Sequence, residues 1–325
     1  MRRRDFLALT AAAAVRPAPA RAQGSRLQVI GFVNAGSLKG YERTYNAFLK
    51  GLSETGFEKD RNVSIDVHWA EGHYDRLPDL LAGFVQRKVN VVAATSTPAA
   101  VAAKKANLPM PVVFTTSGDP VQIGLVTSLS RPNANMTGAS QLNVEVAPKR
   151  LELMHELLPN AKSFGLLVNP ANPVAAAVSK EMDTAAAALG RKLHVTHAST
   201  SDELQAVFET LVREQASGLV IGTDTFFNSE HEDIARLAIR HRMPTVYQYP
   251  EFTAAGGLMS YGGNVTESYR LAGGYAGRIL KGEKPADLPV QRVTKVELII
   301  NLKTSKLLGI DVPLQLVNRA DEVIE

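Results

Sequence analysis

The stretch that decides the fold runs from residue 89 to residue 120 and reads VNVVAATSTPAAVAAKKANLPMPVVFTTSGDP. It contains two short apolar runs rich in β-branched residues, and each run ends in hydroxyl-bearing residues followed by proline, at 95–98 and 115–120. An alanine-rich helical pattern joins them, and Pro109 and Pro111 end it. Short continuous apolar runs between chain breakers are typical of strands buried on both faces. A helix that joins two such strands predicts a βαβ unit with parallel, neighbouring strands.

Parallel neighbouring strands bring their polar ends to the same edge of the sheet, where open α/β sheets bind ligands. The hydroxyl groups at these two strand ends therefore predict a pocket that hydrogen-bonds a small polar molecule. Thr97 and Asp119 are also suited to helix capping, because each precedes a proline at the first helical position. Capping and ligand contact are compatible, since helix N-termini also attract anions.

The alternation of strands and helices extends along the chain in two blocks. The first block predicts strands at 28–33, 63–69, 89–94, 111–114 and 136–141, and helices at 42–54, 74–87 and 147–158. The second predicts strands at 163–168, 193–197, 218–222 and 245–247, and helices at 173–189, 201–214 and 229–241. Such alternation predicts an α/β fold with parallel sheets flanked by helices. The restart near Ala161 predicts two similar lobes.

The first 22 residues have the features of an export signal. An arginine-rich segment at 2–7 (RRRDFL) precedes an apolar stretch at 7–15, and residues 20–22 (ARA) have the form of a cleavage site. The arginine pair followed by Phe6 and Leu7 resembles a twin-arginine signal. The alternative is a short basic tail on a cytoplasmic protein. We expect cleavage after Ala22 and release into the periplasm.

Composition and charge exclude several classes of protein. The chain has 36 Lys and Arg against 32 Asp and Glu, but without residues 1–22 it carries 31 of each and no net charge. The sequence therefore predicts no nucleic-acid partner, and no helix-turn-helix is evident. The apolar stretches are too short to cross a bilayer. Cysteine is absent, so disulfides, thiolate chemistry and a lipid anchor on an N-terminal cysteine are excluded.

Several short motifs occur in the order seen in one family. They are GFVN at 31–34, NVSI at 62–65, WAEG at 69–72, YDRLP at 74–78, GDPV at 118–121, RPNAN at 131–135, TG at 137–138 and LLVNP at 166–170. In this combination, the chain from about Arg26 to its end resembles the substrate-binding proteins of ABC transporters, in the group that includes TrpX-like tryptophan-binding proteins. The resemblance implies a type I periplasmic binding protein, with two Rossmann-like lobes joined by a hinge of three crossing strands. It also implies a membrane permease and an ATPase as partners, and a ligand that varies within the group.

The resemblance places the crossings near Gln141 to Asn143, near Tyr249 and near Pro285 to Pro289. Lobe 1 would then comprise residues 26–140 and 250–283, and lobe 2 residues 141–249 and 284–325, with a late strand at 296–301. The implied ligand contacts in lobe 1 are Asn34, Ser37, Ser96, Thr97, Thr116 and Asp119. The implied contacts in lobe 2 are Asn169, Asn172, Asp224 and Tyr247, and Tyr261 and Gly262 would lie near the hinge.

Two carboxylates, Asp119 and Asp224, occur at the predicted strand ends, where arginine and lysine are nearly absent. Helix capping explains Asp119 well because Pro120 follows it. It explains Asp224 less well, because the next helix is predicted to start at Ser229. We therefore expect Asp224 to receive a positively charged or hydrogen-bond-donating group of the ligand, such as an amino group.

A ligand carboxylate would instead meet Ser96 and Thr97 at a helix N-terminus. Tyr247 and Tyr261 would pack against the apolar part of the ligand. The expected ligand is an amino acid, or an aromatic or aliphatic organic acid, bound to a monomer without a cofactor or a metal ion.

The alternative is a periplasmic enzyme or a ligand-sensing protein on the same two-lobe fold. No G-x-G-x-x-G follows the first strand, and neither G-x-x-x-x-G-K nor G-x-S-x-G occurs. His194 and His197 are three residues apart on a predicted strand, so their rings point to opposite faces. His68 and His73 flank a loop and lack an obvious third metal ligand. These observations favour binding over catalysis.

Overall fold

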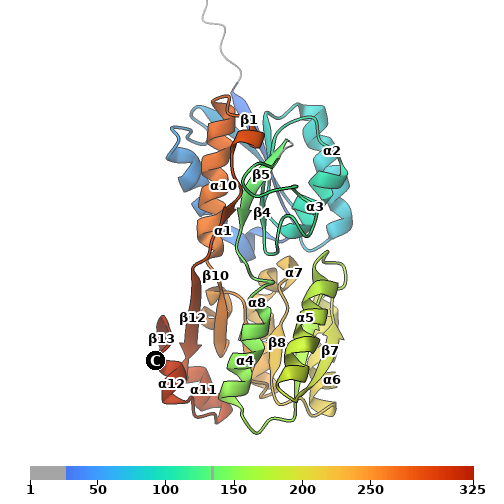
Figure 1. Cartoon of the computed structure of the whole chain (residues 1–325), viewed down its shortest axis with the longest axis vertical. Helices are drawn as coiled ribbons and strands as arrows, with labels where there is room; N and C mark the ends of the chain where they lie inside the picture. The colour runs from blue at the N-terminus through green and yellow to red at the C-terminus, as the bar shows by residue number, and fades with distance from the viewer. Residues whose placement is uncertain (1–26, 133–134) are drawn as a thin grey trace, which may run out of the picture.

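The computed structural model describes residues 27–132 and 135–325, and it folds into two α/β lobes stacked along the long axis of the molecule (Figure 1). The predicted fold class is therefore confirmed. The predicted export signal and cleavage site lie outside the described residues.

Lobe 1 is built on a parallel sheet with the strand order β11-β5-β4-β3-β1-β2. Its strands are β1 (Gln28–Asn34), β2 (Val63–Trp69), β3 (Val91–Ala94), β4 (Val112–Thr116), β5 (Met136–Ser140) and β11 (Gln291–Arg292). Its helices are α1 (Leu38–Ser53), η1 (Tyr74–Arg76), α2 (Leu77–Arg87), α3 (Thr97–Lys105), α10 (Val265–Leu280) and η2 (Pro285–Asp287). Figure 1 shows α1 and α10 on one side of the sheet, and α2 and α3 on the other.

Lobe 2 is built on a sheet with the strand order β13-β12-β10-β9-β8-β6-β7, in which β12 runs antiparallel to β10. Its strands are β6 (Ser163–Val168), β7 (Lys192–His197), β8 (Leu219–Ile221), β9 (Thr245–Tyr247), β10 (Met259–Gly263), β12 (Val296–Asn301) and β13 (Glu322–Ile324). Its helices are α4 (Ala147–Leu157), α5 (Ala175–Ala188), α6 (Ser201–Arg213), α7 (Thr225–Ser229), α8 (His231–Arg240), α9 (Pro250–Ala254), α11 (Leu302–Leu308) and α12 (Leu314–Val317).

The βαβ unit predicted from residues 89–120 is present as β3, α3 and β4, and the two strands are parallel neighbours. All residues of both strands are buried, as continuous apolar runs in a parallel sheet require. Both strands consequently end at the same edge of the lobe 1 sheet, and that edge faces lobe 2.

The chain crosses between the lobes three times. The first crossing follows β5 at Gln141, in the predicted place. The second lies between β10 and α10, at Gly263 and Asn264, rather than near Tyr249. The third lies between β11 and β12, at residues 293–295.

Two segments therefore lie in the lobe opposite to the one that the sequence-based boundaries gave them. Residues 250–263 form α9 and β10 in lobe 2, and residues 284–292 form η2 and β11 beside β5 in lobe 1. The reason for the first difference is local. Pro250 is at the start of α9, where proline fits, so it continues the strand–helix alternation of lobe 2 instead of ending it.

Helix α10 carries residues of lobe 1 toward the gap between the lobes and packs closely along α1. A Cβ on Gly51 of α1 would lie 1.8 Å from the Arg270 carbonyl oxygen, and one on Gly273 of α10 would lie 2.0 Å from that of Phe48. Only glycine allows this approach at either position. The packing fixes the N-terminal end of α10 beside the ends of β3, β4 and β5.

Candidate functional site

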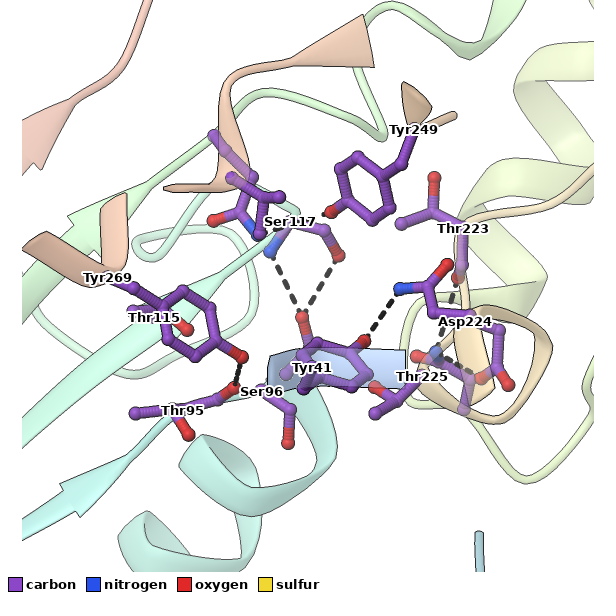
Figure 2. Close-up of a pocket in the computed structure, with 15 residues that line it drawn as sticks. Tyr41, Thr95, Ser96, Thr115, Ser117, Thr223, Asp224, Thr225, Tyr249 and Tyr269 are labelled. Atoms are coloured by element: carbon purple, nitrogen blue, oxygen red, sulfur yellow. Dashed lines mark hydrogen bonds between the residues drawn. The ribbon is translucent and has the colours of Figure 1, made fainter. Parts of the chain in front are cut away.

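A small cavity lies between the two lobes, and both lobes contribute to its wall (Figure 2). It is lined by Tyr41, Thr95, Ser96, Thr97, Thr115, Ser117, Gln141, Asn172, Thr223, Asp224, Thr225, Asn228, Tyr249, Val265 and Tyr269. Among the described residues, this wall contains one carboxylate and no lysine, arginine or histidine.

Lobe 1 contributes the N-terminus of α3 and a cluster of hydroxyl groups. Ser96 caps the helix, since its Oγ accepts a hydrogen bond from the Ala99 N–H at 3.3 Å. The Thr97 hydroxyl lies 3.1 Å from that of Thr116 and 3.0 Å from that of Ser117. The positive end of the helix dipole and the hydroxyl groups together suit an anionic group of a ligand.

Lobe 2 contributes Asp224, whose carboxylate is buried and accepts four hydrogen bonds. The donors are Asn169 Nδ2 (3.1 Å), Asn172 Nδ2 (2.6 Å), the Tyr74 hydroxyl (2.8 Å) and the Phe226 N–H (2.9 Å). Four bonds fill the acceptor capacity of a carboxylate. Burial raises the pKa of Asp224 above its ordinary value, while the bonds from Asn172, Tyr74 and Asn169 act in the opposite direction.

The structure corrects the predicted helix start in this region. Residues 229–241 were expected to form one helix, but α7 begins at Thr225 and α8 follows it from His231. Asp224 is the N-cap of α7, since its side chain accepts from the Phe226 N–H. The argument that capping does not explain Asp224 is therefore wrong, although the carboxylate still lines the cavity.

Three tyrosines give the cavity an aromatic wall, and their hydroxyl groups are held in place. The Tyr41 hydroxyl accepts from Asn228 Nδ2 at 2.6 Å, and that of Tyr249 accepts from Asn143 Nδ2 at 2.8 Å. The Tyr269 hydroxyl donates to the Thr95 carbonyl oxygen. Burial raises the pKa of all three, to about 12 for Tyr249, so the rings stay neutral.

Arg150 lies behind this wall, fully buried. Its guanidinium donates to the carbonyl oxygens of Tyr261 (3.1 Å) and Asn143 (2.9 Å) and to the Thr223 hydroxyl (3.1 Å). Burial lowers the pKa of Arg150 to about 10. The side chain joins the first crossing, strand β10 and the cavity wall, and it supplies a positive charge behind that wall.

The lobes touch each other around the cavity. Contacts across the gap join Tyr41 to Asn228 (2.6 Å), Ser37 to Ser229 (3.0 Å), Lys39 to Glu232 (2.6 Å) and Tyr74 to Asp224 (2.8 Å). Helix α7, at the end of lobe 2 that faces lobe 1 in Figure 1, makes two of these contacts, and its N-cap Asp224 makes a third. The structure is therefore a closed arrangement of the two lobes.

The structure brings seven of the twelve residues proposed from the sequence together at the cavity. Those in the lining are Ser96, Thr97, Asn172 and Asp224. Those directly behind it, and hydrogen-bonded to it, are Asn34, Thr116 and Asn169.

The other five lie away from the lining: Ser37, Asp119, Tyr247, Tyr261 and Gly262. Ser37 lines a groove at the surface between the lobes. Asp119 caps the turn that follows it, because its Oδ1 accepts from the Val121 N–H at 2.7 Å. Tyr247 stacks on Phe252 with ring centroids 4.6 Å apart.

Tyr261 and Gly262 belong to strand β10 of lobe 2. The Tyr261 ring packs against the hydrophobic core of that lobe. The backbone of Gly262 passes so close to the Gln248 carbonyl oxygen that a Cβ would lie 2.0 Å from it.

Sequence reasoning missed eleven lining residues: Tyr41, Thr95, Thr115, Ser117, Gln141, Thr223, Thr225, Asn228, Tyr249, Val265 and Tyr269. Thr95, Thr115 and Ser117 belong to the same hydroxyl-rich strand ends as the residues it found. Tyr41 and Tyr269 lie on helices α1 and α10, where no strand-end signal points to them.

Two absences apply to residues 27–132 and 135–325, the part of the chain that the structure describes. Within these ranges, no three His, Cys, Asp or Glu side chains are grouped so that they could hold a metal ion. Nor does any helix there have both the length and the apolar character needed to span a membrane.

Comparison with known proteins gives consistent results. The family model described as ABC transporter substrate binding protein matches residues 26–324. A protein named "Tyrosine-binding protein" from Clostridioides difficile is 28% identical over 268 residues, which cover 82% of this chain and 76% of that protein. The two-lobe fold is that of type I periplasmic binding proteins.

Two solved structures, each covering 92% of this chain, differ in how closely they match. An ABC domain from Streptococcus pneumoniae in complex with L-Trp has a TM-score of 0.83 at 25% identity, and the match covers 100% of that chain. A ligand-free, open substrate-binding protein from Clostridium difficile has a TM-score of 0.62 at 27% identity, and the match covers 99% of that chain. The better match to the complex is consistent with the lobe contacts described above.

Proposed function

Because the chain belongs to the ABC transporter substrate-binding protein family, we propose that it captures an amino acid with an aromatic side chain between its lobes. The observation that carries the proposal is the cavity itself, with a carboxylate on one lobe, a helix N-terminus on the other, and tyrosine rings in its wall. The family partners are an ABC permease and its ATPase, to which the loaded protein delivers its ligand.

The groups in the wall match an amino acid in the following way. The carboxylate of the ligand meets the N-terminus of α3 at Ser96 and Thr97, where N–H groups and hydroxyls favour negative charge. Its ammonium group faces the charge of Asp224, which four hydrogen bonds already hold in position. Its ring packs against Tyr249 and Tyr269.

The relatives support the aromatic class. One carries the name of a tyrosine-binding protein, and another was solved with L-Trp. We further propose that the protein acts as a monomer in the periplasm, binds no nucleic acid, and releases its ligand unchanged. The family model, which describes a substrate-binding protein, supports binding without a reaction.

A second candidate is an amine-free solute, such as an aromatic organic acid. The observation in its favour is that the four acceptor positions of Asp224 are filled in the closed structure, so an ammonium group gains no unoccupied acceptor there. Such a solute would still use the helix N-terminus and the tyrosine rings.

A thermal-shift screen of the mature protein tests the proposal against amino acids and matched aromatic acids without the amino group. A ligand at ~100 times its dissociation constant adds about 2.7 kcal/mol to the free energy of unfolding. Amino acids should raise the melting temperature by a few degrees, and calorimetry should then give the affinity. A response to the amine-free acids alone would instead select the second candidate.

A further inference from the structure

Two side chains in the cavity wall have a buried oxygen atom without a hydrogen-bond partner. They are Thr115, through Oγ1, and Gln141, through Oε1. Thr115 is only 1% exposed and Gln141 only 5%. Among the described residues that line the cavity, no other side chain has such an atom. Since buried polar groups are nearly always paired, these two point to a group that the ligand supplies.

The two atoms belong to neighbouring strand ends on the same face of the lobe 1 sheet. Strands β4 and β5 are parallel, and Thr115 is opposite Ala139. Gln141 follows Ala139 by two residues, so its side chain points to the same face as Thr115. Helix α10 packs across that face and carries Tyr269.

This end of the cavity is distinct from the end at Asp224. Figure 2 shows Thr115 beside Tyr269 on one side of the cavity, and Thr223, Asp224 and Thr225 on the other. An amino acid whose ammonium group faces Asp224 therefore has Thr115 on the opposite side of the cavity, and Gln141 is also part of the lining.

The chemistry of the two oxygens restricts what can occupy that end. The Gln141 amide oxygen only accepts hydrogen bonds, whereas the Thr115 hydroxyl can donate or accept. A phenol group would satisfy both, because its O–H donates to Gln141 and its oxygen accepts from Thr115. An indole N–H would satisfy Gln141 alone. A phenyl ring would bury both oxygens without a partner.

We propose that Thr115 and Gln141 form a side-chain subsite that selects aromatic amino acids with a hydrogen-bond donor on the ring. The expected order of affinity is tyrosine, then tryptophan, then phenylalanine. This inference rests on the proposed function, and it adds the residues that discriminate among aromatic ligands. Sites built to hydrogen-bond a ligand O–H or N–H reject analogues that lack the group far more strongly than apolar pockets reject a change in size.

Calorimetry on the mature protein with L-tyrosine, L-tryptophan and L-phenylalanine tests the subsite. Phenylalanine should bind at least about tenfold more weakly than tyrosine, because a buried acceptor stays unpaired. Thr115→Val keeps the shape of the side chain and should narrow the ratio of tyrosine to phenylalanine affinity several-fold. Gln141→Met should reduce two affinity ratios, that of tyrosine to phenylalanine and that of tryptophan to phenylalanine.

Thr196→Val is the control, because the Thr196 hydroxyl bonds to the Leu166 carbonyl oxygen in lobe 2, away from the cavity. It should leave all three affinities unchanged. Circular dichroism and melting curves establish that each variant folds. Because Thr115→Val and Gln141→Met change different residues, each variant tests the subsite on its own. Equal affinities for tyrosine and phenylalanine in the wild type would overturn the subsite and leave the proposed function standing. Binding of none of the three amino acids would overturn both.

Discussion

The Tyr74 hydroxyl of lobe 1 donates a hydrogen bond of 2.8 Å to Asp224 Oδ2 of lobe 2. The same hydroxyl accepts from the Phe226 N–H at 3.2 Å. When the lobes are closed, the Tyr74 side chain of η1 therefore bonds both to the N-cap carboxylate of α7 and to a backbone N–H in the first turn of that helix. Opening the lobes breaks both bonds, so Tyr74 favours the closed state.

Tyr74→Phe removes only the hydroxyl and should shift the protein toward the open state. A hydrogen bond to a charged group contributes about 1.5–3 kcal/mol, so ligand affinity should fall by about tenfold or more. The loss should appear mainly as faster dissociation in stopped-flow measurements. Tyr275→Phe is the matched control, because the Tyr275 hydroxyl bonds to Pro289 within lobe 1. Unchanged dissociation in Tyr74→Phe would show that this contact does not hold the lobes together.

Gly40 lies where α1 meets α7, and the closed arrangement leaves no room for a side chain there. A Cβ at this position would lie 2.7 Å from both the Asn228 carbonyl oxygen and the Ser229 Cα. Gly40→Ala should prevent full closure, so small-angle scattering should show no decrease in the radius of gyration when ligand is added. Gly274→Ala, whose Cβ would be 3.7 Å from its nearest neighbour, should close normally. Normal closure of both variants would contradict the closed contact seen here.

The buried carboxylate of Asp224 should make binding depend on pH. Burial raises its pKa above 3.8 in the folded protein, so its contribution to the free energy of unfolding is largest below that value and decreases as the pH rises through the raised pKa. A ligand ammonium group favours the ionised form and lowers the pKa again. Amino-acid affinity should consequently weaken as the pH falls from about 7 toward about 4, the ordinary range of carboxyl pKa values.

Calorimetry across that pH range, in buffers of different ionisation enthalpy, measures the proton released on binding. Asp224→Asn cannot ionise and should show neither proton release nor pH-dependent affinity at this site. It should also bind amino acids about ten- to a hundred-fold more weakly at neutral pH, if the charge of Asp224 attracts the ammonium group. Identical pH profiles for the two proteins would remove Asp224 from ligand recognition.

Arg150 should be needed for stability as well as for the position of the cavity wall. Arg150→Lys keeps a positive charge but cannot reach the Tyr261 and Asn143 carbonyl oxygens and the Thr223 hydroxyl together. Buried acceptors left without a donor should lower the free energy of unfolding by about 1–3 kcal/mol in urea titrations. Arg236→Lys, at an exposed ion pair with Asp233, should have no comparable effect. Equal unfolding midpoints for the two variants would refute the structural role of Arg150.

Export through the twin-arginine route is a prediction from residues 1–22 alone. Replacing Arg3 and Arg4 with lysine should leave the uncleaved precursor in the cytoplasm, because the arginine pair is what resembles that signal. Cell fractionation followed by immunoblotting distinguishes precursor from mature protein. Normal export of the variant would contradict this route without excluding secretion by another one.

The order of strands and helices could be read from the sequence because it depends on neighbouring residues. The continuous apolar run that forms β6 and the alternating one that forms β2 were bounded correctly by the breakers on either side. The hydroxyl groups of Ser96 and Thr97 could be placed at the cavity for the same reason, since a parallel βαβ unit fixes where its strands end.

The rest of the site depends on contacts between segments far apart in the chain. Tyr41 and Tyr269 lie on two helices whose packing fixes them beside the strand ends, and nothing local marks either tyrosine as a cavity residue. Tyr249 faces the cavity although Tyr247, two residues earlier on the same strand end, is buried against Phe252. Local apolar patterns determine which segments become strands and helices, because each pattern repeats with the geometry of its own element. The cavity was decided only by the tertiary structure, because its wall forms where two separately folded lobes meet.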